Sequence, residues 1–215
     1  RWDAVARDYA LGTWPSGSLA GAAVYWQVDT HGKVKAGKIM LYDPSTGKRR
    51  KEVRSTSFVH FENTGQNAGE LNVEQCLFGE HLLKTWPMDA PVAVVESEKT
   101  AMIAAALVPA YLWVAVGSLG GFTLAKMQAL TGRKVLAFPD LSGDGSALTK
   151  WRVKAVEFGH LFAAVHVSDM LERMATDADR DAGLDIADYL LRSGTGNTST
   201  ATLPTPTPAP VQHQH

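Results

Sequence analysis

The chain has 215 residues, of which 45% are hydrophobic and 20% are charged, which suits one globular domain or one domain with a smaller partner. Its 22 acidic and 21 basic residues leave a net charge of −1, so attraction to nucleic acid must come from a local cluster of cations. A single cysteine, Cys76, excludes an internal disulfide and fits a reducing compartment. The sequence has neither a bilayer-spanning apolar run nor a signal-peptide pattern, and it therefore predicts a cytoplasmic protein without a membrane partner.

The first part of the chain alternates apolar and polar residues over positions 1–64. Turn signals at His31-Gly32 and at residues 44–47 separate runs rich in Val, Tyr, Trp, Ile and Phe, which is typical of antiparallel hairpins. Residues 73–86 carry apolar residues at helical spacing and end before Pro87, so they predict a connecting helix. We therefore expect a β-rich N-terminal subdomain with a connecting helix over residues 1–88.

The second part, residues 89–192, alternates strand and helix patterns. Apolar runs at 92–95, 111–116, 135–138 and 163–167 are each followed by a helical pattern, which predicts an α/β domain with a parallel sheet flanked by helices. Residues 193–215 contain few large apolar side chains and are rich in Pro and Thr, so we expect a disordered tail.

Acidic residues follow two of the predicted strands. Glu96 comes directly after the first, while Asp140 and then Asp144 follow the third in the segment "FPDLSGDG". Because the carboxyl ends of parallel strands share one edge of a sheet, we expect Glu96 and Asp140 to meet there. Carboxylates at such an edge suit a Mg²⁺-type cation, although a single Glu96 could instead stabilise the start of the following helix.

Other polar or flexible residues near this edge have two interpretations each. Gly117, Gly120 and Gly121 follow the second strand and could let backbone amides approach a phosphate, or could simply form a tight turn. Lys99 could bind a phosphate or pair with a neighbouring glutamate. Asp185 and Asp188 could approach the edge or form the solvated face of a helix.

A local excess of cations marks the predicted hairpins, and it favours contact with the phosphates of a single-stranded nucleic acid over an ordinary solvated turn. The cluster comprises Lys33, Lys35, Lys38, Lys48, Arg49, Arg50, Lys51 and Arg54. The aromatic residues nearby, Trp26, Tyr42 and Phe58, are better explained as core.

Together these motifs resemble the toprim domain of bacterial primases, topoisomerases and some nucleases. The resemblance is carried by "ESEKTA" at the first strand end, "FPD" at the third and "GLDIADYLL" near the end of the chain. It is similar in particular to primase-like proteins of bacterial mobile elements and phages. The stretch "VYWQVDTHGKVKAGKIMLYDPSTGKR" also resembles the β-rich subdomain that precedes the toprim domain in those proteins.

The resemblance implies roles for individual residues. Glu96 matches the toprim glutamate, which is assigned to metal binding or acid–base work, and Asp140 matches the first aspartate of an Asp-x-Asp motif. Ser142 stands where the second aspartate is expected, and Asp144 lies two positions further on, in a loop flexible enough to reach a metal.

The function implied is that of a primase-like nucleotidyltransferase in the replication of a mobile element. Its cofactor would be Mg²⁺ or Mn²⁺, and its partners would be single-stranded DNA, nucleoside triphosphates and a replicative helicase. A toprim nuclease would use much the same groups. Because Ser142 removes a carboxylate from the motif, a DNA-binding module without catalytic activity is a further alternative.

Overall fold

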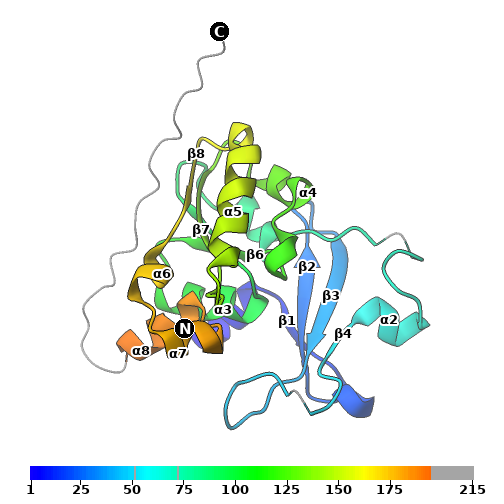
Figure 1. Ribbon diagram of the computed structural model, residues 1–215. Coiled ribbons are helices and arrows are strands. Elements are labelled where there is room, and N and C mark those ends of the chain that lie inside the picture. Colours follow the sequence, from blue (N-terminus) through cyan, green and yellow to red (C-terminus); the bar gives the residue numbers. More distant parts are fainter. Residues whose placement is uncertain (51, 72, 195–215) are drawn as a thin grey trace. The chain divides into compact units, whose positions relative to one another are not determined.

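The computed structural model describes residues 1–50, 52–71 and 73–194, and the predicted tail therefore lies almost entirely outside the described residues. The chain divides into two compact units, Arg1–Lys84 and a second unit that begins at Thr85 (Figure 1). Among the described residues, no helix is both long enough and apolar enough to cross a membrane.

The first unit is built on an antiparallel sheet of four strands in the order β1-β2-β3-β4. The strands are β1 (Leu11–Thr13), β2 (Ala23–Val28), β3 (Val34–Met40) and β4 (Thr56–Phe58). Short helices accompany them, namely α1 (Trp2–Asp8), η1 (Gly17–Leu19) and α2 (Val59–Thr64). The hairpins predicted from the alternating pattern are thus present.

Trp26 is partly buried and packs against the core of this sheet. Its ring lies against Gly37 on the paired strand β3, where an added Cβ would lie only 2.8 Å from two ring carbons. Leu19, Val24 and Ile39 are buried beside it. The tryptophan therefore serves packing, as the sequence indicated for the aromatic residues of this region.

The connecting helix predicted over residues 73–86 is mostly wrong. Only η2 (Glu80–Lys84) is helical, and it is a 3-10 helix. Gly79 precedes it with a φ of +84°, a left-handed conformation that interrupts an α-helix. The apolar residues that suggested helical spacing, Leu77 and Phe78, are buried in an irregular segment. Phe78 packs edge-on against Tyr25 of β2.

The second unit is an α/β fold with a four-stranded parallel sheet, which confirms the predicted fold class. Its strands are β5 (Val92–Val95), β6 (Leu112–Ala115), β7 (Lys134–Phe138) and β8 (Ala164–Val167), in the order β6-β5-β7-β8. Val95 pairs with Ala115 on one side and with Phe138 on the other. The segments after β6 and β7 consequently begin on either side of Glu96, at one edge of the sheet.

Helices connect these strands and cover the sheet (Figure 1). They are α3 (Glu98–Leu107), η3 (Leu119–Gly121), α4 (Leu124–Met127), η4 (Gln128–Leu130), α5 (Ser146–Glu157) and η5 (Gly159–Leu161). Helix α5 packs against β8, whereas α3 packs against the last described helix, α8 (Ile186–Gly194).

The final helical stretch is divided into three helices rather than one. Helices α6 (Met170–Met174) and α7 (Asp177–Ala182) precede α8. Thr176 begins α7 with a capping box, and Gly183 ends it in the left-handed conformation. Asp179 accepts hydrogen bonds from Arg192 Nη1 at 2.8 Å and from the Tyr189 hydroxyl at 3.2 Å, and these bonds tie α7 to α8.

Candidate active site

The candidate site begins at the carboxyl ends of β5 and β7. Glu96 directly follows β5, whose four residues are fully buried. Asp140 follows β7 after Phe138 and Pro139. The backbone N–H of Asp140 donates a hydrogen bond to the Glu96 carboxylate. The structure therefore brings together the two acidic residues that the sequence singled out.

Burial gives both carboxyl groups unusual proton affinities. Burial and the negative charge of Asp185 raise the pKa of Glu96 to about 7, against the opposing effects of the Asp140 amide and Lys150. Burial and the charges of Glu96, Asp185 and Asp188 raise the pKa of Asp140 to about 9. Carboxyl groups that cannot all ionise in one place retain protons unless a cation replaces them.

The sequence left open whether Asp185 approaches the edge of the sheet or lies on the solvated face of a helix. It lies at the start of α8, and burial raises its pKa while the Thr100 hydroxyl that donates to it at 2.5 Å lowers it. Its charge acts on both Glu96 and Asp140. Asp185 is therefore the third acidic group near the edge of the sheet, and its only sequence signal was the motif "GLDIADYLL".

Lys99 and Lys150 supply positive charge near these acids. Lys99 lies in the first turn of α3 and lowers the pKa of both Asp140 and Asp185. Lys150 on α5 acts on Glu96. The structure thus places Lys99 close enough to act on the carboxylates, and its binding of a phosphate stays a prediction.

Two residues of the predicted motif have local structural partners instead. Ser142 Oγ accepts the backbone N–H of Ala147 at 3.1 Å and so stabilises the start of α5. Asp144 is exposed, and its carboxylate accepts the N–H of Ser146 at 3.0 Å. In this arrangement Asp144 is engaged in its own turn rather than directed at Glu96 and Asp140.

The oxygen donors at this edge meet the needs of one type of divalent cation. Oδ1 of Asp140 is buried without a hydrogen-bond partner among the described residues. In the same part of the chain, no group of three or more His, Cys, Asp or Glu side chains is arranged to hold a metal ion. Mg²⁺ is often held by only one or two carboxylates, with waters and substrate phosphates completing its shell. Glu96 and Asp140 fit that mode of binding.

The three glycines of the turn after β6 differ from one another. Gly117 has a φ of +89°, and Gly121 packs so closely on Val116 that an added Cβ would lie 2.3 Å from the Val116 carbonyl oxygen. Gly120 has open space around it. The buried Lys126 ammonium donates to the same Val116 oxygen at 2.7 Å. Tight packing therefore explains Gly121, while phosphate binding by this turn stays a prediction.

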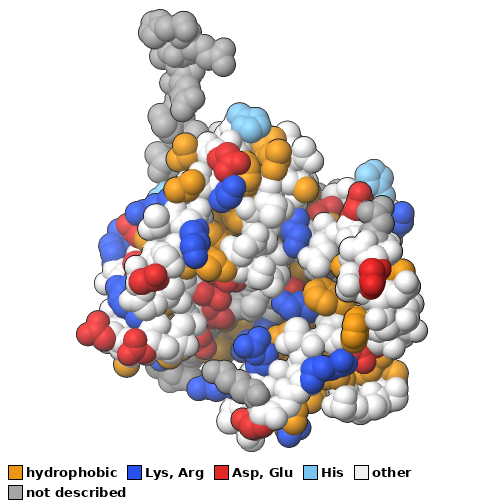
Figure 2. Space-filling model, turned by 45° about the vertical axis from the view of Figure 1, so that its right-hand side comes forward, with side chains coloured by type: hydrophobic (Ala, Val, Ile, Leu, Met, Phe, Trp, Pro, Cys, Tyr) orange, Lys and Arg blue, Asp and Glu red, His pale blue; other side chains and the backbone are white. Residues whose placement is uncertain are grey.

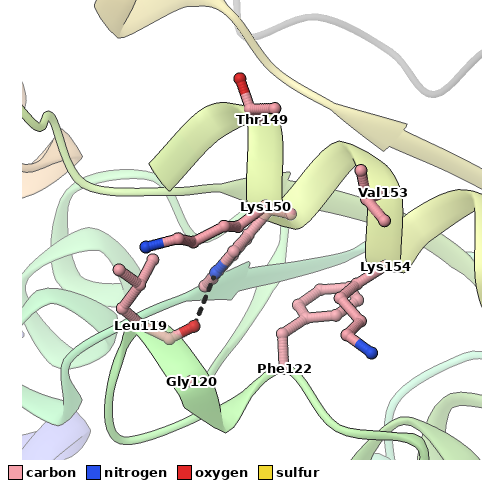
Figure 3. A pocket seen from close by; sticks show the side chains of 8 residues that line it. Leu119, Gly120, Phe122, Thr149, Lys150, Val153 and Lys154 are labelled. Carbon is pink, nitrogen blue, oxygen red and sulfur yellow. Dashed lines mark hydrogen bonds between the residues drawn. The ribbon is translucent and has the colours of Figure 1, made fainter. Parts of the chain in front are cut away.

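A pocket of about 540 Å³ opens between this turn and α5 (Figure 3). The indole N–H of Trp151 donates to the Leu119 carbonyl at 3.2 Å and fixes the turn to the helix. Figure 3 shows Lys150 and Lys154 leaving α5 in different directions, Lys150 on the side of Leu119 and Lys154 on the side of Phe122. Lys150 lines this largely apolar pocket, and its positive charge also lowers the pKa of Glu96.

The cations of the predicted cluster in the first unit differ in their contacts, because some of them pair with glutamates. Lys35 pairs with Glu74 at 3.3 Å, and Arg54 pairs with Glu62 while its guanidinium lies over the Phe61 ring. Lys38 is half-buried on β3, and Lys51 lies outside the described residues. Arg54 is nevertheless exposed, as are four other cations of the cluster, namely Lys33, Lys48, Arg49 and Arg50. On the face that Figure 2 shows, Lys and Arg side chains occur singly among acidic, hydrophobic and uncharged ones.

The fold and the candidate site define an α/β protein in which a parallel sheet gathers acidic side chains at the carboxyl ends of its strands. The chain belongs to the family described as a domain of unknown function, DUF6371, whose model matches residues 1–141. The matched region includes Glu96 and Asp140 but ends before Asp185. No curated protein matches the sequence.

Primase structures are among the solved proteins that resemble this chain. The primase fragment of the bacteriophage T7 primase-helicase is 13% identical, with a TM-score of 0.47 over 90% of this chain and 70% of that one. The Escherichia coli primase catalytic core is 13% identical, with a TM-score of 0.44 over 93% and 66%. The RNA polymerase domain of Mycobacterium tuberculosis primase is 10% identical, with a TM-score of 0.42 over 93% and 68%. These values describe a distant resemblance.

Proposed function

We propose that the second unit is a magnesium-dependent phosphoryl-transfer domain of the primase type, which joins nucleotides on single-stranded DNA. The observation that carries the proposal is the half-buried pair of Glu96 and Asp140 at the carboxyl ends of adjacent parallel strands. The toprim-like motifs around these residues support the same function.

In this proposal Glu96 and Asp140 hold the cation through their carboxylate oxygens. When bound, Mg²⁺ would neutralise charge on the transferring phosphate and leave coordination positions for its oxygens. Lys99 and Lys150, whose charges act on these acids, would bind further phosphate oxygens. Because the pKa of Glu96 is raised to about 7 without a cation, cation binding would release a proton from this carboxyl group near neutral pH.

A non-catalytic DNA-binding module is the second candidate. Ser142 is not a carboxylate and Asp144 accepts the backbone N–H of Ser146, so the proposed site has fewer carboxylates than a two-metal site uses. A nuclease would use the same groups as a nucleotidyltransferase. Primer synthesis and strand cleavage, assayed on the same single-stranded template, separate these three functions.

The first prediction concerns cation binding. Mg²⁺ or Mn²⁺ at millimolar concentration should raise the melting temperature, because a ligand at 100 times its Kd stabilises the folded state by about 2.7 kcal/mol. Glu96→Gln should abolish this increase. Glu157→Gln is the matched control, since Glu157 is an exposed residue that pairs with Lys154 on α5. An unchanged wild-type melting curve would contradict a cation site.

The second prediction concerns DNA binding by the first unit. Replacing Lys48, Arg49 and Arg50 by glutamine should weaken binding of single-stranded DNA of any sequence. The log–log dependence of affinity on salt should become shallower, by roughly 0.7 for each phosphate that the variant no longer neutralises. Because these residues are exposed, the melting temperature should hardly change.

Titrations at several salt concentrations measure both effects. Lys134→Gln, which removes an exposed cation at the amino end of β7, should leave affinity and slope unchanged. A triple variant with wild-type affinity and slope would show that the cluster is only a solvated turn.

A further inference from the structure

A hydroxyl pair links the start of α3 to the start of α8. Thr100 is fully buried, and its Oγ1 donates to Asp185 Oδ2 at 2.5 Å across 85 positions of sequence. Ser97 Oγ lies 2.7 Å from Thr100 Oγ1 and accepts the Thr100 backbone N–H at 3.1 Å. Both hydroxyls therefore lie in the turn that directly follows Glu96.

The direction of these bonds follows from the groups involved. An ionised carboxylate only accepts hydrogen bonds, so the single hydroxyl proton of Thr100 must point to Asp185. The Thr100 oxygen can then accept the proton of Ser97, and the two hydroxyls form a chain directed at the carboxylate. The other Asp185 oxygen accepts the backbone N–H of Asp188 at 3.1 Å. Both oxygens of Asp185 are thereby fixed in place.

Asp185 needs such support because of its neighbours. It is half-buried, and the charges of Asp188, Glu96 and Asp140 act on it. Without the bonds from Thr100 and from the Asp188 amide, this carboxylate would be free to turn away, and a cation bound nearby would lose its negative charge.

We infer that Thr100, supported by Ser97, is a positioning residue that holds the Asp185 carboxylate in place at the start of α8, where its charge acts on Glu96 and Asp140, and so strengthens cation binding. Thr100 acts through Asp185 and does not itself contact the cation. The inference rests on the proposed cation site. The competing role is a purely structural one, in which the bond only fastens α8 to α3.

Three variants separate these roles. Thr100→Val keeps the shape of the side chain and removes the hydroxyl, Thr100→Ser keeps the hydroxyl, and Asp185→Asn removes the charge that Thr100 is proposed to hold. Mn²⁺ affinity is measured by calorimetric titration below the melting temperature of every variant, and metal-free stability is measured in parallel.

Thr100→Val should weaken Mn²⁺ binding by about 10-fold, the lower end of the range for residues that orient metal ligands. Thr100→Ser should restore wild-type affinity. In the double variant with Asp185→Asn, Thr100→Val should have no additional effect, because its action passes through Asp185. A structural fastening would instead lower the metal-free melting temperature of Thr100→Val and leave its Mn²⁺ affinity at the wild-type value, which would overturn the inference.

The outcomes distinguish this positioning role from the proposed function. Binding that is lost in Glu96→Gln but unchanged in Thr100→Val overturns only the positioning role. Absence of Mn²⁺ binding by the wild-type chain overturns both. If Thr100→Val does not fold, Ser97→Ala provides the same test with the Thr100 hydroxyl in place, and wild-type Mn²⁺ affinity in that variant would count against the hydroxyl chain.

Discussion

Replacing Gly121 by alanine is expected to destabilise the second unit by about 1 to 3 kcal/mol, the usual cost of overpacking. The added Cβ would lie 2.3 Å from the carbonyl oxygen of Val116, which is backbone and cannot rotate away. That oxygen also accepts the hydrogen bond of the buried Lys126 ammonium, so a shift would disturb a second interaction. Urea unfolding of the wild type and the variant measures the change in stability.

Gly120→Ala is the matched control for this substitution. An added Cβ at Gly120 meets nothing within 4 Å, so the free energy of unfolding should change by less than about 0.5 kcal/mol. If Gly121 instead serves the approach of a phosphate, Gly121→Ala would weaken nucleotide binding while leaving stability unchanged. That result would contradict the packing explanation.

The second large effect is expected from Asp140→Asn, which should stabilise the metal-free protein at pH 8. Because the pKa of Asp140 is raised to about 9, the folded state keeps a proton that the unfolded state releases above about pH 4. Stability therefore falls as pH rises through this window. Asparagine does not titrate, so the variant does not lose stability in this way. Its free energy of unfolding at pH 8 should exceed that of the wild type by more than about 1.4 kcal/mol, the equivalent of one pKa unit.

The pH dependence and the metal response test this expectation together. The advantage of Asp140→Asn should disappear near pH 4, where aspartic acid is largely protonated in the folded state and begins to be so in the unfolded state. The variant should also lose the thermal stabilisation by Mg²⁺. A variant that is less stable than the wild type at pH 8 would show that burial of the Asp140 carboxyl group does not destabilise the folded protein.

The parallel strands were predictable because their residues are buried on both faces. Val92–Val95 is a continuous apolar run in the sequence and forms β5 without a change of bounds. Glu96 and Asp140 were predictable for a related reason, since their positions follow from where the strands end. Residues that directly follow two parallel strands lie close together whenever those strands are neighbours in the sheet, as β5 and β7 are.

Features that depend on tertiary packing were not predictable. Apolar spacing over residues 73–86 suggested a helix, but Leu77 and Phe78 are buried by packing that a pattern of residues cannot reveal. Asp185 could not be assigned to the candidate site because its place depends on the packing of α8 on α3. Ser142 and Asp144 looked like variants of a metal motif, whereas local hydrogen bonds to backbone amides occupy both.

The hydrogen bond from Thr100 to Asp185 also bears on how the protein is made. Glu96 and Asp140 can come together as soon as β5 and β7 have paired, whereas Asp185 arrives only with the last described helix. A nascent chain that has not yet been translated to α8 therefore carries the paired carboxylates without their third acidic neighbour. If Thr100 positions Asp185 as proposed, full affinity for the cation is acquired only when α8 has packed on α3.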